Sequence, residues 1–196
     1  MIELVDRVAE ELSFLPNEQM FFGASVLALY VDRQEVLDDN VRPSEDVDVV
    51  VTVGVKLRAR EAIAHLEQEL RDHGFVHDTR PHRRNIHAFL SPSKIAVDVV
   101  MDSMYEPDDW PLLSRGHSRE VVLPSGRRVR VPSPAYYLAC KVSASKSPKR
   151  WEGSYYSHDL EDIALLLTGS SEFPQAVVEG DEQVREFLSG WAREVL

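Results

Sequence analysis

Residues 41–53 read VRPSEDVDVVVTV, and the other features of the chain are arranged around this stretch. Its run of β-branched residues, bounded by a proline and a glycine, predicts a buried strand. Side chains alternate between the two faces of a strand, so Asp46 and Asp48 should share one face while Val47 and Val49 point into the core. Two carboxylates held close together repel each other, and a bound cation relieves the repulsion, with Mg²⁺ favoured by hard oxygen ligands. Two surface acids at a solvated strand end are the alternative that this motif leaves open.

A third carboxylate interrupts another apolar run. Residues 86–90 and 95–100 predict two strands joined by a short turn, and Asp98 lies in the middle of the second. A lone carboxylate in an apolar strand is costly to bury unless it is paired or coordinated. If this strand lies beside the first, Asp98 joins Asp46 and Asp48 in a three-carboxylate cluster. Otherwise Asp98 is a strand residue that faces solvent.

A small-residue turn precedes the first strand. Residues 20–30 read MFFGASVLALY, in which a glycine, an alanine and Ser25 separate two apolar runs. A glycine at such a turn lets a ligand or a neighbouring backbone come close. The free amides at the start of the next helix, together with Ser25, would suit a phosphate. Many core helices also start after a glycine, so the plainer interpretation stays open.

The rest of the chain predicts an α+β fold. The other expected elements are amphipathic helices over 2–15, ended by Pro16, and over 55–73, with Gly74 as C-cap; a loop over 102–118; a β-hairpin over 121–131; and helices from Pro134, with Ser133 as N-cap, from Ser157, and over 172–196. The length of 196 residues predicts one domain with a core of its own, to which a helical subdomain can be added.

Composition excludes several classes of protein. The net charge of -11 argues against nonspecific adhesion to nucleic acid or anionic membrane as the main activity. A polyanionic substrate would therefore need a local basic patch, and residues 80–84, 127–130 and 141–150 offer candidates, unless they are solvated basic faces. The single cysteine, Cys140, excludes an intrachain disulfide and a cysteine-based zinc site, and its apolar surroundings favour a structural role.

The same composition indicates a cytoplasmic protein. A lone cysteine is consistent with a reducing compartment. No stretch approaches the ~18 apolar residues of a membrane span, and the N-terminus lacks the basic region of an export signal. We therefore expect neither a membrane partner nor export.

The order of the features is more informative than any one of them. The chain resembles the DNA polymerase β-like nucleotidyltransferases, and within them the AbiEii-type (MenT-type) toxins. The resemblance rests on three features in this order: the turn Gly23-Ala24-Ser25, the segment from Arg42 to Asp48, and the later Asp98. The later half of the family pattern is matched by Lys141, Arg150, His158, Asp159, Asp162 and Ile163. Two residues depart from that pattern. Ala24 stands where the family often has a second glycine or a serine, and His158 stands in place of a frequent lysine.

The resemblance implies a nucleotidyltransferase fold, with a small mixed or antiparallel sheet flanked by helices. It divides the chain into a catalytic core over 1–132 and a helical C-terminal subdomain over 133–196 that completes the nucleotide site. Asp46 and Asp48 would bind Mg²⁺, and Asp98 would hold the catalytic ion and assist deprotonation of the acceptor. In such a site two ions about 3.5–4 Å apart activate the attacking hydroxyl and neutralise the leaving group.

The resemblance also implies how the nucleoside triphosphate (NTP) is bound. Gly23 and Ser25 would cradle its β- and γ-phosphates, and Lys141 and Arg150 would supply positive charge. Asp159 would orient one of these cations, or would only complement the dipole of its helix. Ser44 is counted with the nucleotide-binding residues, either bonded to backbone near the carboxylates or as an exposed hydroxyl.

Biologically, the resemblance implies the toxin of a toxin-antitoxin or phage-defence pair. It would transfer a nucleotide from an NTP to an RNA acceptor, expected to be the 3′ end of tRNA, and so block translation, with a cognate antitoxin as its protein partner. Two alternatives keep the fold. One is a small-molecule nucleotidyltransferase of the aminoglycoside-modifying type, which an acidic surface would suit, and the other is a non-catalytic nucleotide-binding protein.

Overall fold

The core of the protein is a mixed β-sheet. A computed structural model describes residues 1–15, 19–33, 35, 44, 46–52, 59–81, 87–106, 108–146 and 158–195. In this part of the chain the strands are β1 (Met20–Phe22), β2 (Asp46–Val51), β3 (Val76–His77), β4 (Ala88–Leu90), β5 (Ala96–Met101), β6 (Ser118–Val122) and β7 (Arg128–Pro132). They form one sheet in the order β3-β4-β5-β2-β1-β7-β6. The pairs β2–β5 and β1–β7 are parallel and the other pairs antiparallel, so the prediction of a mixed sheet in an α+β fold is confirmed.

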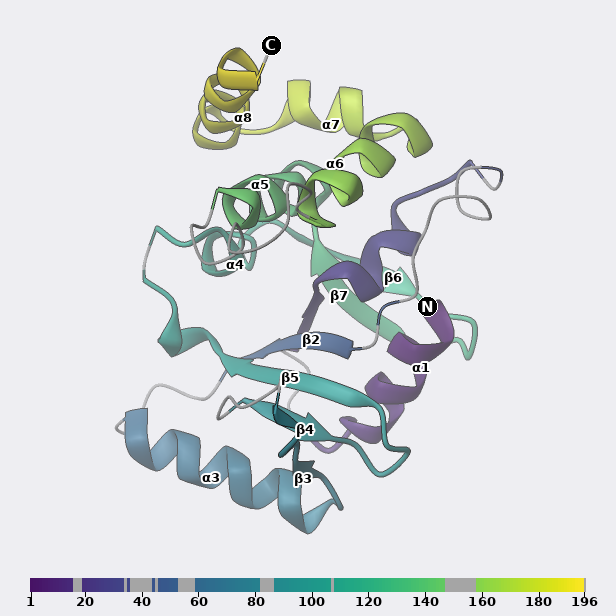
Figure 1. Cartoon of the computed structure of the whole chain (residues 1–196), viewed down its shortest axis with the longest axis vertical. Helices are drawn as coiled ribbons and strands as arrows, with labels where there is room; N and C mark the ends of the chain where they lie inside the picture. The colour runs from purple at the N-terminus through teal and green to yellow at the C-terminus, as the bar shows by residue number, and fades with distance from the viewer. Residues whose placement is uncertain are drawn as a thin grey trace.

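Helices flank the sheet, with α1 alongside its central strands and a group of helices beyond one end (Figure 1). The helical elements are α1 (Ile2–Glu11), the 3₁₀-helix η1 (Ala24–Leu29), α3 (Ala59–Asp72), the 3₁₀-helix η3 (Asp102–Met104), α4 (Trp110–Leu113), α5 (Pro134–Ser145), α6 (His158–Gly169), α7 (Phe173–Glu179) and α8 (Glu182–Val195). Helix α3 lies beside β3, β4 and β5, whereas α5 packs against α4, α6, α7 and α8 at the other end. The division at residues 132 and 133 stays a prediction. None of the described helices is long and apolar enough to cross a bilayer.

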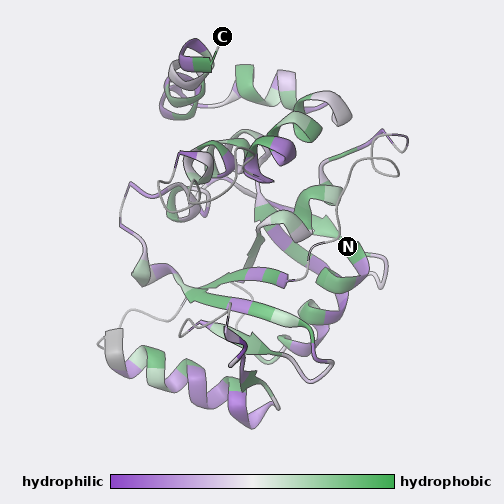
Figure 2. Ribbon diagram, in the orientation of Figure 1, coloured by the Kyte–Doolittle hydropathy of each residue, from purple (hydrophilic) through white to green (hydrophobic). Residues whose placement is uncertain are grey.

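The hydrophobic side of β2 and β5 faces the main core. Val47, Val49, Val97 and Val99 are all at most 1% exposed and pack with side chains from α1, η1 and α3. Figure 2 shows both strands as hydrophobic ribbons interrupted by hydrophilic residues. The alternation expected from the sequence is therefore confirmed, and it places the strand aspartates on the opposite face from these valines.

Turn chemistry fixes several element ends as the sequence predicts. Gly74 follows α3 with φ +85°. The Gly74 N–H donates to the Arg71 carbonyl at 3.0 Å, and the Phe75 N–H donates to the Leu70 carbonyl at 2.9 Å. This pair of bonds is a Schellman motif, which confirms Gly74 as the C-cap. Helix α5 begins at Pro134 after Ser133, also as predicted, although the Ser133 side chain makes no capping hydrogen bond.

Three expectations need correction. Helix α1 ends at Glu11, because the chain then turns through three-residue hydrogen bonds such as Leu15 N–H to the Leu12 carbonyl at 3.0 Å. Leu12 and Leu15 are buried without being helical, so their apolar spacing misled the prediction. The helix after the glycine turn is a six-residue 3₁₀-helix, and the expected loop over 102–118 contains η3 and α4. The expected start of the 55–73 helix lies partly outside the described residues.

Candidate active site

Two aspartates lie side by side on neighbouring strands. In the parallel ladder between β2 and β5, Asp48 is the direct partner of Asp98. Paired strands are about 4.8 Å apart, so the two side chains leave the same face at neighbouring positions. Asp46 lies on that face too, one pleat or about 6.6 Å earlier along β2. The structure therefore brings Asp48 and Asp98 together across the sheet, which the sequence could state only as a condition.

These aspartates have the donor chemistry for a hard cation. Carboxylate oxygens are the ligands that Mg²⁺ prefers, and Asp48 and Asp98 present two carboxylates at adjacent register positions. Across the described ranges, however, no group of three or more His, Cys, Asp or Glu side chains is placed so that it could hold a metal ion. The Ser44 hydroxyl donates to the Asp46 carbonyl at 2.9 Å and lies 3.3 Å from Asp46 Oδ1. A metal site at Asp46, Asp48 and Asp98 thus stays a prediction, with Asp48 and Asp98 as its closest pair.

The glycine turn touches the Asp48 carboxylate. Phe22 pairs with Asp48 across β1 and β2, and Gly23 follows with φ +71° and ψ -168°, a conformation that is essentially restricted to glycine. A Cβ at Gly23 would lie 1.7 Å from Asp48 Oδ2. The carboxylate therefore occupies the space that any other side chain would take. Only glycine allows this contact between the turn and the acid.

Hydroxyl groups hold the backbone on both sides of this turn. Ser25 is fully buried, and its hydroxyl donates to the Phe22 carbonyl at 3.2 Å. Tyr137 from α5 donates to the Gly23 carbonyl at 2.8 Å. The Ser25 hydroxyl, which the sequence offered to a phosphate, is thus engaged in shaping the turn. A phosphate at this place would meet the backbone N–H groups of the turn instead.

Lys141 is held by two acids of α6. Its Nζ lies 2.6 Å from Asp162 Oδ2 and 3.4 Å from Asp159 Oδ1, and the residue is only 7% exposed. Asp159 is thus in contact with Lys141, one of the two cations that it was expected to orient, but Asp162 makes the shorter contact. A buried ammonium requires such partners, since an unpaired charge is costly away from water. The pair of acids fixes where the Lys141 charge lies.

Aromatic side chains connect these groups. Burial raises the pKa of Tyr137 well above its ordinary value, with further contributions from Tyr30, Asp162, Cys140 and Asp48. Tyr137 is therefore within electrostatic reach of Asp162 on α6 and of Asp48 on β2. Tyr105 packs against Met20, Phe22 and Val50 on the carboxylate face, and burial, followed by Asp48, raises its pKa to about 12. Burial also raises the pKa of Cys140 to about 12, so its thiol stays protonated, as a structural role requires.

Some residues predicted for the site lie outside the described part of the chain, namely Arg42, Arg150 and residues 82–86. Other residues contribute to the site although the sequence did not predict them. Asp162 was part of the family pattern but had no assigned role, although its spacing of three from Asp159 puts both on one side of α6. Tyr137 and Tyr105 carried no sequence signal, because one lies in an apolar helix and the other in a segment expected to be a loop.

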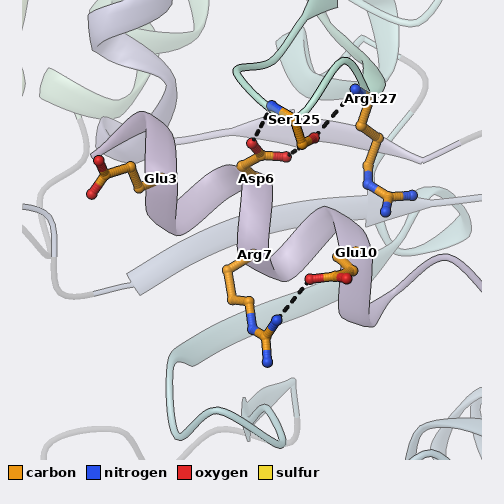
Figure 3. Close-up of a pocket in the computed structure, with 6 residues that line it drawn as sticks. All are labelled: Glu3, Asp6, Arg7, Glu10, Ser125 and Arg127. Atoms are coloured by element: carbon orange, nitrogen blue, oxygen red, sulfur yellow. Dashed lines mark hydrogen bonds and ion pairs between the residues drawn. The ribbon is translucent and has the colours of Figure 1, made fainter.

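A cavity of about 270 Å³ elsewhere on the protein is lined by none of the residues predicted to bind metal or nucleotide, although Arg127 belongs to the predicted basic segment 127–130. Its lining is Glu3, Asp6, Arg7, Glu10, Ser125 and Arg127, between α1 and the β6–β7 turn (Figure 3). The Ser125 N–H and hydroxyl donate to Asp6 at 2.9 and 2.5 Å, and Arg7 pairs with Glu10 at 2.7 Å. The Ser125–Asp6 bonds fasten the hairpin to α1, whereas the Arg7–Glu10 pair lies within the helix. The carboxylate face of β2 and β5 is accordingly the stronger candidate for the active site.

Strand aspartates beside a glycine turn, on a mixed sheet completed by a helical lysine, are the features of a nucleotidyltransferase. The chain belongs to the family described as nucleotidyl transferase AbiEii toxin, type IV toxin-antitoxin system, whose sequence pattern matches residues 8–189. The protein is thus an enzyme of the nucleotidyltransferase class.

Solved structures agree with this fold. An antigenic nucleotidyltransferase-like protein from Paracoccidioides brasiliensis is 17% identical with a TM-score of 0.59, over 98% of this chain and 87% of that one. ANT(2″)-Ia in complex with adenylyl-2″-tobramycin is 16% identical with a TM-score of 0.50, over 100% of this chain and 98% of that one. A comparison with curated protein sequences gives no match. At these identities the solved structures establish the fold and leave the substrate open.

Proposed function

We propose that this nucleotidyltransferase moves a nucleoside monophosphate from an NTP to an RNA acceptor, the 3′ end of a tRNA, and thereby blocks translation in the cytoplasm until an antitoxin protein counteracts it. The observation that carries the proposal is the in-register pair of Asp48 and Asp98, with the Asp48 carboxylate against the Gly23 turn. Membership of a toxin family supports the biological role.

In the proposed reaction the acceptor hydroxyl oxygen bonds to the α-phosphorus, the bond to the β-phosphate oxygen breaks, and pyrophosphate leaves. Asp48 and Asp98, with Asp46, would hold Mg²⁺, which when bound neutralises charge on the reacting phosphate and the leaving group. Asp98 would take the proton of the acceptor hydroxyl. The backbone N–H groups of the Gly23 turn would receive the β- and γ-phosphates, and Lys141 would add a fixed positive charge beside them.

A basic cavity supports a polyanionic acceptor. It has a volume of about 270 Å³ and is lined by Met20, Arg115, Gly116, Ser118 and Arg130. Arg130 on β7 is the register partner of Met20 on β1, and Met20 is the register partner of Val50 on β2. Val50 lies two residues after Asp48 and on the same face of the sheet. Two strand spacings and one pleat put Arg130 about 12 Å from Asp48 between Cα atoms.

Arg130 is the better phosphate ligand of the two arginines. Arg115 is ion-paired with Asp102, whereas Arg130 is exposed and makes no ion pair with the part of the chain that the structure describes. A guanidinium group matches the geometry of a phosphate. The net charge of -11 therefore does not prevent a local contact with an RNA backbone.

The test is a transfer assay with Mg²⁺, each α-labelled NTP in turn, and total tRNA. We expect label in tRNA with the wild-type protein, loss of label with Asp48→Asn or Asp98→Asn, and unchanged label with Asp6→Asn as the matched control. Arg130→Glu should weaken RNA binding and reduce its dependence on salt. Label that persists in Asp48→Asn would contradict the assignment of the site.

A small cationic acceptor is the second candidate. The acidic charge balance suits such a molecule, and one similar fold is that of ANT(2″)-Ia, solved with adenylyl-2″-tobramycin. Replacing tRNA by an aminoglycoside in the same assay separates the two candidates. Label in the aminoglycoside and none in RNA would overturn the RNA proposal while keeping the catalytic residues.

A further inference from the structure

Two buried tyrosine hydroxyls make equivalent contacts at different places in the fold. Tyr137 donates to the Gly23 carbonyl at 2.8 Å, and Tyr30 donates to the Pro132 carbonyl at 2.7 Å. Their rings stack with centroids 4.3 Å apart and planes 7° from parallel. The residues are only 1% and 2% exposed, so water does not replace either bond. One of the two contacts reaches the candidate active site.

The Tyr137 contact acts on the peptide that links Gly23 to Ala24. A trans peptide is planar, so its carbonyl and the following N–H point in opposite directions and turn together. By holding the Gly23 carbonyl, the Tyr137 hydroxyl fixes the direction of the Ala24 N–H. Gly23 itself has a backbone conformation that is essentially restricted to glycine, and the Asp48 carboxylate lies where a Cβ at this position would be.

Tyr137 also connects this turn to Lys141. The two residues are four apart on α5, so they lie on the same side of the helix, and Lys141 Nζ is 5.9 Å from the Tyr137 ring centroid. One helix face thus presents both the hydroxyl that bonds to the turn and the ammonium proposed for the triphosphate. Burial raises the pKa of Tyr137, so the hydroxyl keeps its proton and donates throughout the neutral range.

We propose that Tyr137 is a positioning residue of the nucleotide site, whose hydroxyl holds the Gly23–Ala24 peptide in the orientation that receives the nucleotide phosphates. Tyr137 does not touch the reacting atoms and acts through Gly23. This inference rests on the proposed nucleotidyl transfer. It assigns a role to a residue that neither the family pattern nor the predicted site contains.

The test compares Tyr137→Phe with Tyr30→Phe. Each substitution keeps the ring and its stacking and removes one buried hydroxyl that is bonded to a backbone carbonyl, so similar losses of thermal stability are expected. Only Tyr137→Phe should lower kcat/KM for the NTP, by about tenfold or more, while Tyr30→Phe stays within about twofold of wild type. Tyr137→Phe should also reduce the rise in Tm that Mg²⁺ and NTP produce together.

A rescue variant separates positioning from packing. p-Aminophenylalanine at position 137 keeps an N–H donor at the same place, and it should restore most of the lost kcat/KM. Equal kcat/KM for the two phenylalanine variants at matched Tm would overturn the inference. If wild type binds NTP but labels no acceptor, the proposed function fails, and the NTP-dependent Tm of the variants still decides the role of Tyr137. If NTP leaves the wild-type Tm unchanged, both proposals are overturned.

Discussion

Replacement of Gly23 by alanine is the sharpest perturbation of the site. The new Cβ would lie 1.7 Å from Asp48 Oδ2, whereas real Cβ contacts essentially never fall below 3.0 Å, so the two atoms must separate by at least the difference, 1.3 Å. A misplacement of ~1 Å at an active site can lower the rate by about 100-fold. An alanine held at the positive φ of position 23 also lowers the free energy of unfolding by about 1–3 kcal/mol. We therefore expect Gly23→Ala to fold with a lowered Tm and to lose about 100-fold in kcat.

Gly126→Ala is the matched control. Gly126 also has a positive φ, +84°, but a Cβ there meets no atom within 4 Å. Its backbone cost of about 1–2 kcal/mol should lower Tm by about 2–8 °C and leave the transfer rate unchanged. The assay is initial-rate transfer of α-labelled NTP, together with thermal unfolding of both variants. Activity of Gly23→Ala within a few-fold of Gly126→Ala would refute the contact between the turn and Asp48 as a requirement for catalysis.

Two further predictions concern stability. Asp162→Asn should lower the free energy of unfolding by about 1.5–3 kcal/mol, and Asp159→Asn by less, because Asp162 makes the shorter contact with the buried Lys141. Urea unfolding measures both losses. An equal or larger loss in Asp159→Asn would contradict the geometry. Burial lowers the pKa of His87 below 6.5, so the unfolded chain binds the extra proton and stability falls as pH drops below that value. The decrease in Tm from about pH 7.5 to about pH 5.5 should be smaller in His87→Gln, and equal decreases would remove His87 as a cause.

Local patterns were sufficient to predict much of the fold. The alternation of valine and aspartate around residue 48 predicted which side chains face the core, because a period of two is a property of the strand itself. Glycine and proline predicted the end of α3 and the start of α5 for similarly local reasons. Apolar spacing was less reliable at the end of α1, since Leu12 and Leu15 are buried from a turn.

Long-range contacts were beyond a single sequence. The pairing of Asp48 with Asp98 depends on the register between strands 50 residues apart, which no local propensity specifies. The Tyr137 hydroxyl meets Gly23 across 114 positions, and the tyrosine reads as an ordinary core residue of an apolar helix. Ser25 was identified by its neighbours, but the direction of its hydroxyl, toward the Phe22 carbonyl, is set by the folded turn. The resemblance to a family supplied residue types in order, and the structure supplied their contacts.

The paired strand aspartates are proposed to form the metal-dependent nucleotide site. The most direct test of this proposal is Mn²⁺ binding in the presence of an NTP, measured by electron paramagnetic resonance. Mn²⁺ takes the same oxygen ligands as Mg²⁺, so its signal reports on the carboxylate face without knowledge of the acceptor. Tight binding to wild type and Asp6→Asn, with affinity lower by about tenfold or more in Asp48→Asn and Asp98→Asn, is the expected result. Equal Mn²⁺ affinity in all four proteins would contradict the assignment of Asp48 and Asp98 to the site.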